Sequence, residues 1–144
     1  MTLQAAMEFV ATVCSALFAG AAIYVNAVEH PARMSCGAEA ALAEWAPSYK
    51  RGTRMQAPLA LIGFASAVAA WLAGSSVWWL VGGVVLGFVV PFTFAVIMLT
   101  NRRLASAHGM GSDEARTLLN RWNRLHAARS VCGLVALVIF LLAR

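Results

Sequence analysis

The sequence predicts an all-α integral membrane four-helix bundle, with a short interfacial helix and a cytoplasmic extension of the fourth helix. Of the 144 residues 61% are hydrophobic and only 12% are charged, and the mean hydropathy of +0.74 is far above that of soluble domains. Four apolar stretches, residues 3–28, 57–74, 77–100 and 127–143, each approach the ~20 residues that a helix needs to cross the hydrocarbon layer. We therefore expect one four-span domain over residues 1–144.

The first stretch, residues 3–28, is N-terminal, so a secretory signal is the alternative to a span. A signal carries a basic leading segment and an apolar run of ~7–15 residues. Here no basic residue precedes the run, Glu8 lies within it, and the run is longer. A membrane-spanning helix is the better interpretation.

Basic residues predict the orientation of the spans. Arg33, Lys50, Arg51 and Arg54 follow the first span and five arginines lie between residues 101 and 124, whereas the turn at residues 74–77 has none. Connections rich in Lys and Arg stay in the cytoplasm. Both termini are therefore expected outside and both long connections inside the cytoplasmic (inner) membrane. The net charge of +5 is then a topology signal, and we expect a lipid bilayer and no nucleic acid as partner.

Each long connection contains helix-forming sequence. In GAEAALAEWA, residues 37–46, Trp45 is an apolar anchor, so we expect a short helix at the membrane surface that Pro47 ends. After a glycine-flanked loop, where His108 is expected to be solvated, SDEARTLLNRWNRLHAAR begins at Ser112. Ser112 is expected to cap a helix that runs without a breaker into the fourth span.

Several other features have structural interpretations. Glu8 and three tryptophans, Trp71, Trp78 and Trp79, are expected at the outer surface. The GxxxG spacing of Gly83 and Gly87 permits close helix contact, either within the bundle or in a homo-oligomer. The three cysteines are scattered and form no CxxC pair, which argues against a disulfide framework and against a zinc or iron–sulfur site.

Polar side chains gather at the cytoplasmic ends of three spans. The set comprises Asn26, Glu29, His30 and Arg33 after the first span, Thr100 and Asn101 after the third, and Trp122, Asn123, His126 and Arg129 before the fourth. Helical spacing places the members of each group on one face. Arg129 lies one turn inside the span, so we expect a buried partner, with Glu29 as the candidate. Pro31 is expected to disturb the first helix next to this site.

This set can support acid–base chemistry on an apolar substrate. A histidine, His126 or His30, can remove a proton while Glu29 orients it. Asn101, Asn123 and Arg129 can stabilise the oxyanion that forms. Asn26, Tyr24, Trp122 and Thr100 are the candidates to hold a flat hydrophobic substrate, and molecular oxygen would react with the carbanion. This chemistry requires no cofactor.

Two alternatives remain open at this point. His30 and His126, with Glu29, are plausible ligands for copper or iron, or for a haem between the first and fourth helices. The same polar cluster could instead lock the helices of a non-catalytic protein that binds a lipid or quinone, or of a subunit of a larger assembly.

Four segments carry a resemblance to a known family. They are AGAAIYVNAVEHPAR, YKRGTRMQ after Trp45, PFTFAVIMLTNRRL, and RWNRLHAARSVCGLVAL. Together they resemble the anthrone oxygenase-like family of small four-span membrane proteins, and the resemblance extends from about Ala5 to Leu142. It implies oxidation of an anthrone to an anthraquinone by molecular oxygen. Carried over position by position, it implies a polar set of Asn26, Glu29, His30, Asn101, Trp122, Asn123, His126 and Arg129.

Overall fold

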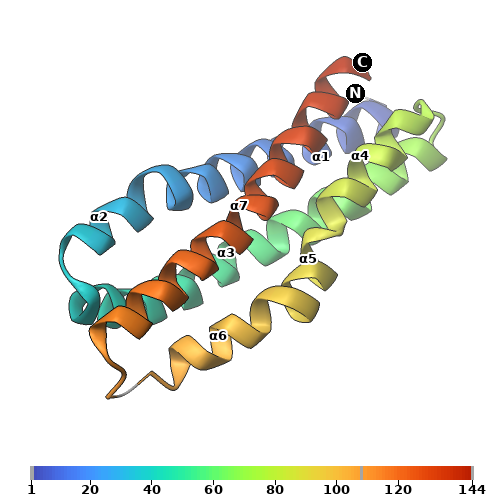
Figure 1. Ribbon diagram of the computed structural model, residues 1–144. Helices are drawn as coiled ribbons and strands as arrows, with labels where there is room; N and C mark the ends of the chain where they lie inside the picture. The colour runs from blue at the N-terminus through green and yellow to red at the C-terminus, as the bar shows by residue number, and fades with distance from the viewer. Residues whose placement is uncertain (1, 108, 144) are drawn as a thin grey trace.

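The computed structural model describes residues 2–107 and 109–143, so His108 lies outside the described residues. Four helical rods, Leu3–Ser35, Ala38–Leu72, Val77–Ala105 and Ser112–Leu142, are long and apolar enough to cross a membrane. They run in alternating directions and bring the two ends of the chain to the same end of the bundle (Figure 1). The all-α four-helix prediction is confirmed.

The first rod consists of α1 (Leu3–Tyr24), the π-helix η1 (Val25–Glu29) and α2 (His30–Ser35). Thr2 caps α1 by accepting a hydrogen bond from the backbone N–H of Ala5 at 3.2 Å. The disturbance expected at Pro31 is confirmed. Proline cannot donate to the carbonyl four residues earlier, and the wider turn just before it includes a hydrogen bond from the His30 N–H to the Val25 carbonyl.

The second rod is the single helix α3 (Ala38–Leu72), which contains Pro47 and Pro58. The prediction that Pro47 ends a separate interfacial helix was therefore wrong. Trp45, 1% exposed, stacks on Tyr49 across this proline, with ring centroids 5.1 Å apart. Burial of Trp45 and its neighbours on the bundle keeps the segment helical, because tertiary packing can outweigh a missing backbone hydrogen bond.

The third rod is interrupted and the fourth is not. The third comprises α4 (Val77–Gly87), α5 (Val89–Phe92), the π-helix η2 (Thr93–Ile97) and α6 (Met98–Ala105). Its break lies where Pro91 cannot donate to the Gly87 carbonyl. The fourth rod, α7 (Ser112–Leu142), confirms the expected helical extension. Its N-cap is Gly111 and not Ser112, which is already the first helical residue and makes no capping hydrogen bond.

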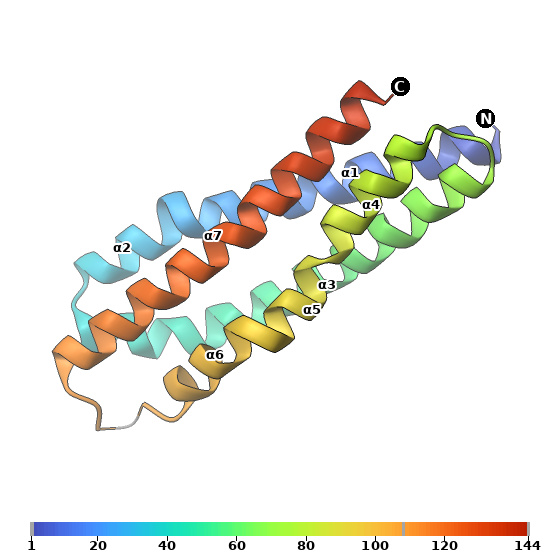
Figure 2. The ribbon, with the colours of Figure 1, turned by 45° about the vertical axis from the view of Figure 1, so that its right-hand side comes forward.

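Two hydrophobic cores divide the bundle along its length. The terminal half, next to both chain ends, packs Phe18, Trp79, Leu86 and Phe140 with small residues. The loop half, next to the two long connections, packs Trp45, Ile97, Leu104, Leu118, Leu119 and Trp122. Figure 2 shows α6 and the first half of α7 at the loop end, with α1, α4 and the second half of α7 at the terminal end.

The terminal half corrects one expectation and resolves another. Trp79 is only 1% exposed and stacks on Phe140 at 5.0 Å, so it belongs to the core, whereas Trp71 and Trp78 are exposed as expected. A Cβ on Gly83 would lie 2.8 Å from Ala67, and one on Gly87 would lie 3.0 Å from Phe64. The GxxxG spacing therefore serves helix contact within the bundle.

Candidate functional site

A cavity of about 730 Å³ opens in the loop half between the first rod, α3 and α7. Its inner wall is made by the buried side chains of Gln56, Trp122, His126 and Arg129. Tyr24, 55% exposed, and Met55, 51% exposed, stand at its outer edge. Its volume falls within the range of pockets that bind small organic molecules.

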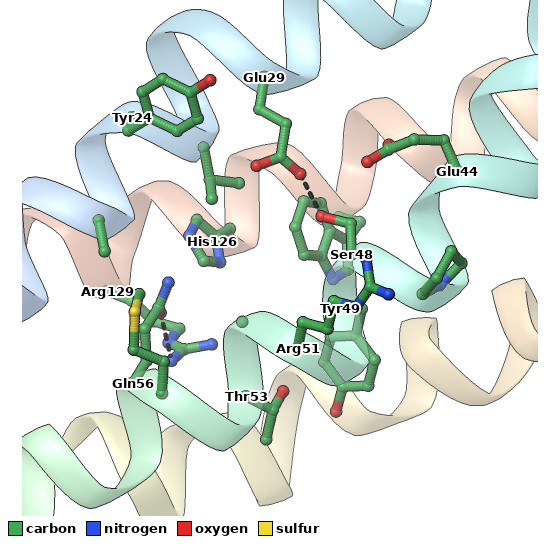
Figure 3. A pocket seen from close by; sticks show the side chains of 16 residues that line it. Tyr24, Glu29, Glu44, Ser48, Tyr49, Arg51, Thr53, Gln56, His126 and Arg129 are labelled. Atoms are coloured by element: carbon green, nitrogen blue, oxygen red, sulfur yellow. Dashed lines mark hydrogen bonds between the residues drawn. The ribbon is translucent and has the colours of Figure 1, made fainter.

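His126 is the buried base that faces this cavity. It is 3% exposed, and its ring stacks on Trp122 with centroids 4.9 Å apart. Neither ring nitrogen makes a hydrogen bond of ordinary geometry, although the backbone of Ala22 lies close enough for a weak one. In Figure 3 its imidazole stands between the helix that carries Glu29 and the helix that carries Ser48 and Gln56. The stacking fixes the ring while leaving its nitrogens available to a ligand.

Arg129 brings a buried positive charge to the same wall. Its Nη2 donates to Gln56 Oε1 at 3.0 Å, and its guanidinium carbon lies 5.6 Å from the centre of the Phe18 ring. The expected partner was Glu29, and that expectation was wrong. Among the described residues no carboxylate forms an ion pair with Arg129. The Nε of Arg129 is buried and has no hydrogen-bond partner. The guanidinium can therefore still donate a hydrogen bond to a bound anion.

Glu29 lines the cavity, but its carboxylate is already hydrogen-bonded to other side chains. Arg33, one helical turn along, and Ser48 from α3 both donate hydrogen bonds to its Oε1. Arg33 Nε also lies 2.7 Å from Glu44 Oε2. Arg33 outcompetes Arg129 for Glu29 because it lies on the same face of the same rod. Within the described chain, Glu29 hydrogen-bonds to neither His30 nor His126, so the structure does not give it the orienting role expected.

Asn26 and Asn123 join the first and fourth rods. Asn26 Nδ2 donates to the Asn123 carbonyl at 2.9 Å and to Asn123 Oδ1 at 2.6 Å, and Ser130 donates to Asn26 Oδ1 at 2.6 Å. Neither asparagine lines the cavity. The sequence placed both at the correct depth, and the structure uses them to connect helices.

Two consecutive side-chain hydrogen bonds fix the position of Trp122. Its Nε1 donates to Asn101 Oδ1 at 2.9 Å, and Asn101 Nδ2 donates to the Tyr49 hydroxyl at 3.0 Å. Asn101 and the neighbouring Thr100 are buried, at 3% and 2% exposure, and neither lines the cavity. Asn101 therefore acts on the site through the indole that stacks on His126.

His30 lies outside the cavity wall. Its Nε2 is 3.2 Å from Asn120 Oδ1, and its Nδ1 is buried without a partner. The described part of the chain contains no group of three or more His, Cys, Asp or Glu side chains placed to hold a metal ion. His30, His126 and Glu29 are thus not gathered there as a three-ligand group.

Of the residues predicted from sequence, Tyr24, Glu29, Trp122, His126 and Arg129 line the cavity, whereas Asn26, His30, Thr100, Asn101 and Asn123 do not. The sequence interpretation missed a whole wall, made by Ser48, Tyr49, Thr53 and Gln56 of α3. These residues were assigned to a connection once Pro47 was taken as a helix end. The segment YKRGTRMQ, noted for its family resemblance, was the available signal.

Comparison with known proteins gives one family. A family model described as anthrone oxygenase matches residues 45–139. The chain is also similar to a protein described as anthrone oxygenase ptaC from Pestalotiopsis fici, with 36% identity over 113 residues that cover 68% of this chain and 80% of that protein. No solved structure matches the chain. The matched range contains the α3 wall, Asn101, His126 and Arg129.

Proposed function

Because the chain belongs to the anthrone oxygenase family, we propose that it oxidises a hydrophobic, polycyclic phenol of the anthrone type with molecular oxygen. Family membership makes the chain an oxygenase-like enzyme; the substrate class is the proposal. The observation that carries it is His126, a buried imidazole without hydrogen-bond partners on the wall of a cavity of about 730 Å³. A flat, three-ring molecule suits a cavity of this size and partly aromatic lining.

His126 removes the first proton. The methylene carbon of an anthrone lies opposite its carbonyl group, and loss of one methylene proton gives an aromatic enolate. The neutral imidazole of His126 can accept this proton on the ring nitrogen that carries the free lone pair. Stacking on Trp122 positions the ring, so the base and the carbon acid meet in a fixed geometry.

Arg129 stabilises the charge that forms on oxygen. As the carbon loses its proton, negative charge moves to the anthrone oxygen. A buried guanidinium whose hydrogen-bond partner is the neutral Gln56 amide offers a positive charge that forms no ion pair with a carboxylate of the described residues. Such a fixed charge in a water-poor site lowers the energy of the transition state more than that of the neutral substrate. We assign stabilisation of the oxyanion to Arg129. Asn101 instead positions the Trp122 side chain.

Oxygen then completes the reaction. The carbanion supplies the electrons for a new C–O bond, and the distal oxygen takes a proton, so a hydroperoxide forms. The remaining C–H bond and the O–O bond then break, and water leaves. The sum is anthrone plus O2 giving anthraquinone plus water, in which the carbon is oxidised and oxygen is reduced.

We further propose that no resident cofactor takes part, because the enolate itself is the reductant of oxygen. Copper, iron or haem held by His30 and His126 is the competing proposal. A visible spectrum and elemental analysis of the purified protein separate the two. A Soret band, or stoichiometric metal that is lost in both His30→Ala and His126→Ala, would favour the competing proposal.

Two further parts of the proposal concern the membrane. We propose that the four rods span the cytoplasmic membrane with both termini outside. The basic connections and the common end of the termini support this orientation. The exposed edge of the cavity at Tyr24 and Met55 would then face lipid, from which an apolar substrate could enter. Reporter fusions at the two termini and in the residue 106–111 connection test the orientation.

The base assignment is tested by His126→Phe and by His126→Gly with added imidazole. Loss of a general base costs about 10²- to 10⁴-fold in rate, so His126→Phe should abolish oxygen consumption and anthraquinone formation from anthrone. Because Phe fills the same space without an unpaired polar atom, the protein should stay folded. Imidazole should restore part of the activity of His126→Gly. His30→Phe is the comparison and should retain measurable turnover. Full activity in His126→Phe would refute the assignment.

A further inference from the structure

A second, smaller cavity lies on the other side of the α3 wall. Its volume is about 140 Å³, and it lies between α3, the interrupted third rod and Arg129 of α7. Ala57 and Ala60 of α3 and Val89, Val90 and Phe94 of the third rod give it an apolar lining. The proposed acid–base steps do not use any of these five residues.

The two cavities share a wall. Tyr49, Thr53, Gln56 and Arg129 line both of them. In Figure 3 these four residues lie along the side of the larger cavity that faces the pale yellow ribbon of the third rod. The hydrogen bond between Arg129 and Gln56 belongs to this wall. A molecule leaving the smaller cavity through the wall would therefore enter the larger cavity directly.

Size and polarity limit what the smaller cavity can hold. Apolar protein cavities of about 150 Å³ stay dry and take up benzene or xenon. Three fused rings are larger than benzene, so an anthrone does not fit. The polar side chains of the lining are those of the shared wall and Thr93 on η2, whereas alanine, valine, phenylalanine and methionine side chains make up the rest and offer water no partner. A small, apolar molecule fits both limits.

We propose that the smaller cavity is a binding site for molecular oxygen, which it delivers to the substrate cavity through the shared wall. This rests on the proposed function, which makes oxygen the second substrate. Oxygen is more soluble in hydrocarbon than in water. Phe94, at the cavity edge, is 67% exposed on the outer surface of the bundle, where lipid would lie. The site would thus be filled from the bilayer, and it is too small to admit the anthrone itself.

Filling the cavity tests the proposal kinetically. Ala57→Leu and Val90→Phe add side-chain volume to residues that line only the smaller cavity and are half-buried. Each should raise the KM for oxygen several-fold, while the KM for anthrone and the kcat at saturating oxygen stay close to those of the wild type. The matched controls are Ala65→Leu on α3 and Val84→Phe on α4, which add the same groups on the exposed surface. Both controls should retain the wild-type KM for oxygen.

Xenon gives a readout that does not depend on turnover. Crystals of the wild-type protein pressurised with xenon should show bound xenon between Ala60 and Val89, and Ala57→Leu and Val90→Phe should lose it. An empty cavity under xenon, or a KM for oxygen in both filled variants equal to that of the controls, would overturn the proposal. So would a raised KM for anthrone in place of oxygen. If anthrone is not turned over but xenon binds, the proposed function fails while the apolar gas site stands.

Discussion

The two halves of the bundle are built on opposite principles. In the terminal half, large side chains fit against glycine: a Cβ on Gly82 would lie 2.6 Å from the Phe140 ring, and one on Gly133 would lie 2.7 Å from the Phe18 ring. In the loop half, π-helices and helix-internal prolines disturb the helices, and tryptophans with buried polar groups replace glycine. The larger cavity, with His126, lies in this second half, and the smaller one lies at the border, because Ala60 and Val89 belong to the terminal core.

The difference shows how one small bundle can be both stable and reactive. Close packing of small residues gives dispersion contacts without polar groups to satisfy. The loop half instead contains buried nitrogen atoms without partners on His30, His126 and Arg129. Such groups cost stability, and they are where a ligand can bind. We infer that the terminal half supports the fold and the loop half carries the chemistry.

The largest effect on stability should follow from overpacking the terminal half. In Gly133→Leu, the new Cβ would push against Phe18 and would lie 3.2 Å from the backbone Cα of Ala19. Overpacking of this kind costs about 1–3 kcal/mol or more, so the thermal unfolding temperature in detergent should fall.

Gly20→Leu is the matched control for that prediction. Gly20 lies on α1, and a Cβ there would meet no described atom within 4 Å beyond its chain neighbours and the adjacent backbone of its own helix. Leucine there should leave stability unchanged or raise it by up to about 1 kcal/mol, because glycine is a poor helix former. If both variants unfold at the same temperature, close packing at Gly133 does not contribute to stability, and the proposed difference between the two halves is wrong.

A similar effect on stability, with a larger one on activity, is expected from a substitution in the loop half. Asn101→Leu removes the acceptor of the Trp122 N–H and the donor to Tyr49. A buried N–H left without its partner costs about 1–3 kcal/mol. Because Trp122 stacks on His126, kcat should fall more than the KM for anthrone changes.

Tyr49→Phe distinguishes the effect of the hydrogen bond between Asn101 and Tyr49 from that of the bond between Trp122 and Asn101. It removes only the hydroxyl that accepts from Asn101, and the ring can still stack on Trp45. Its effect on kcat should be smaller than that of Asn101→Leu. Equal kcat values in Asn101→Leu and the wild type would show that Trp122 is not positioned by this hydrogen bond.

The sequence predicted where each residue lies along the bundle axis, but not how each helix is turned about its own axis. Apolar length located the four rods, and polar residues at their ends predicted that His126, Trp122 and Arg129 gather at one level. Which partner each group takes depends on how the helices are turned about their axes, and no local pattern encodes that. Arg129 was therefore paired with Glu29 in the prediction, although Gln56 of α3 is its partner.

Pro47 shows the same limit for secondary structure. Proline predicts a helix end because it removes a hydrogen bond and crowds the preceding turn. Here the burial of Ala41 and Trp45 on one side and Gln56 on the other keeps α3 continuous. Burial arises only after the rods pack together, so the α3 wall of the cavity could not be predicted from its local sequence.

Proton exchange without oxygen tests the central claim most directly. With anthrone and enzyme in deuterated buffer under anaerobic conditions, the wild type should catalyse exchange of the methylene protons, which mass spectrometry follows. His126→Phe should leave exchange at the uncatalysed rate. Exchange at the wild-type rate in that variant, or no catalysed exchange in a wild-type protein that turns over normally in air, would contradict the role of His126 as the base.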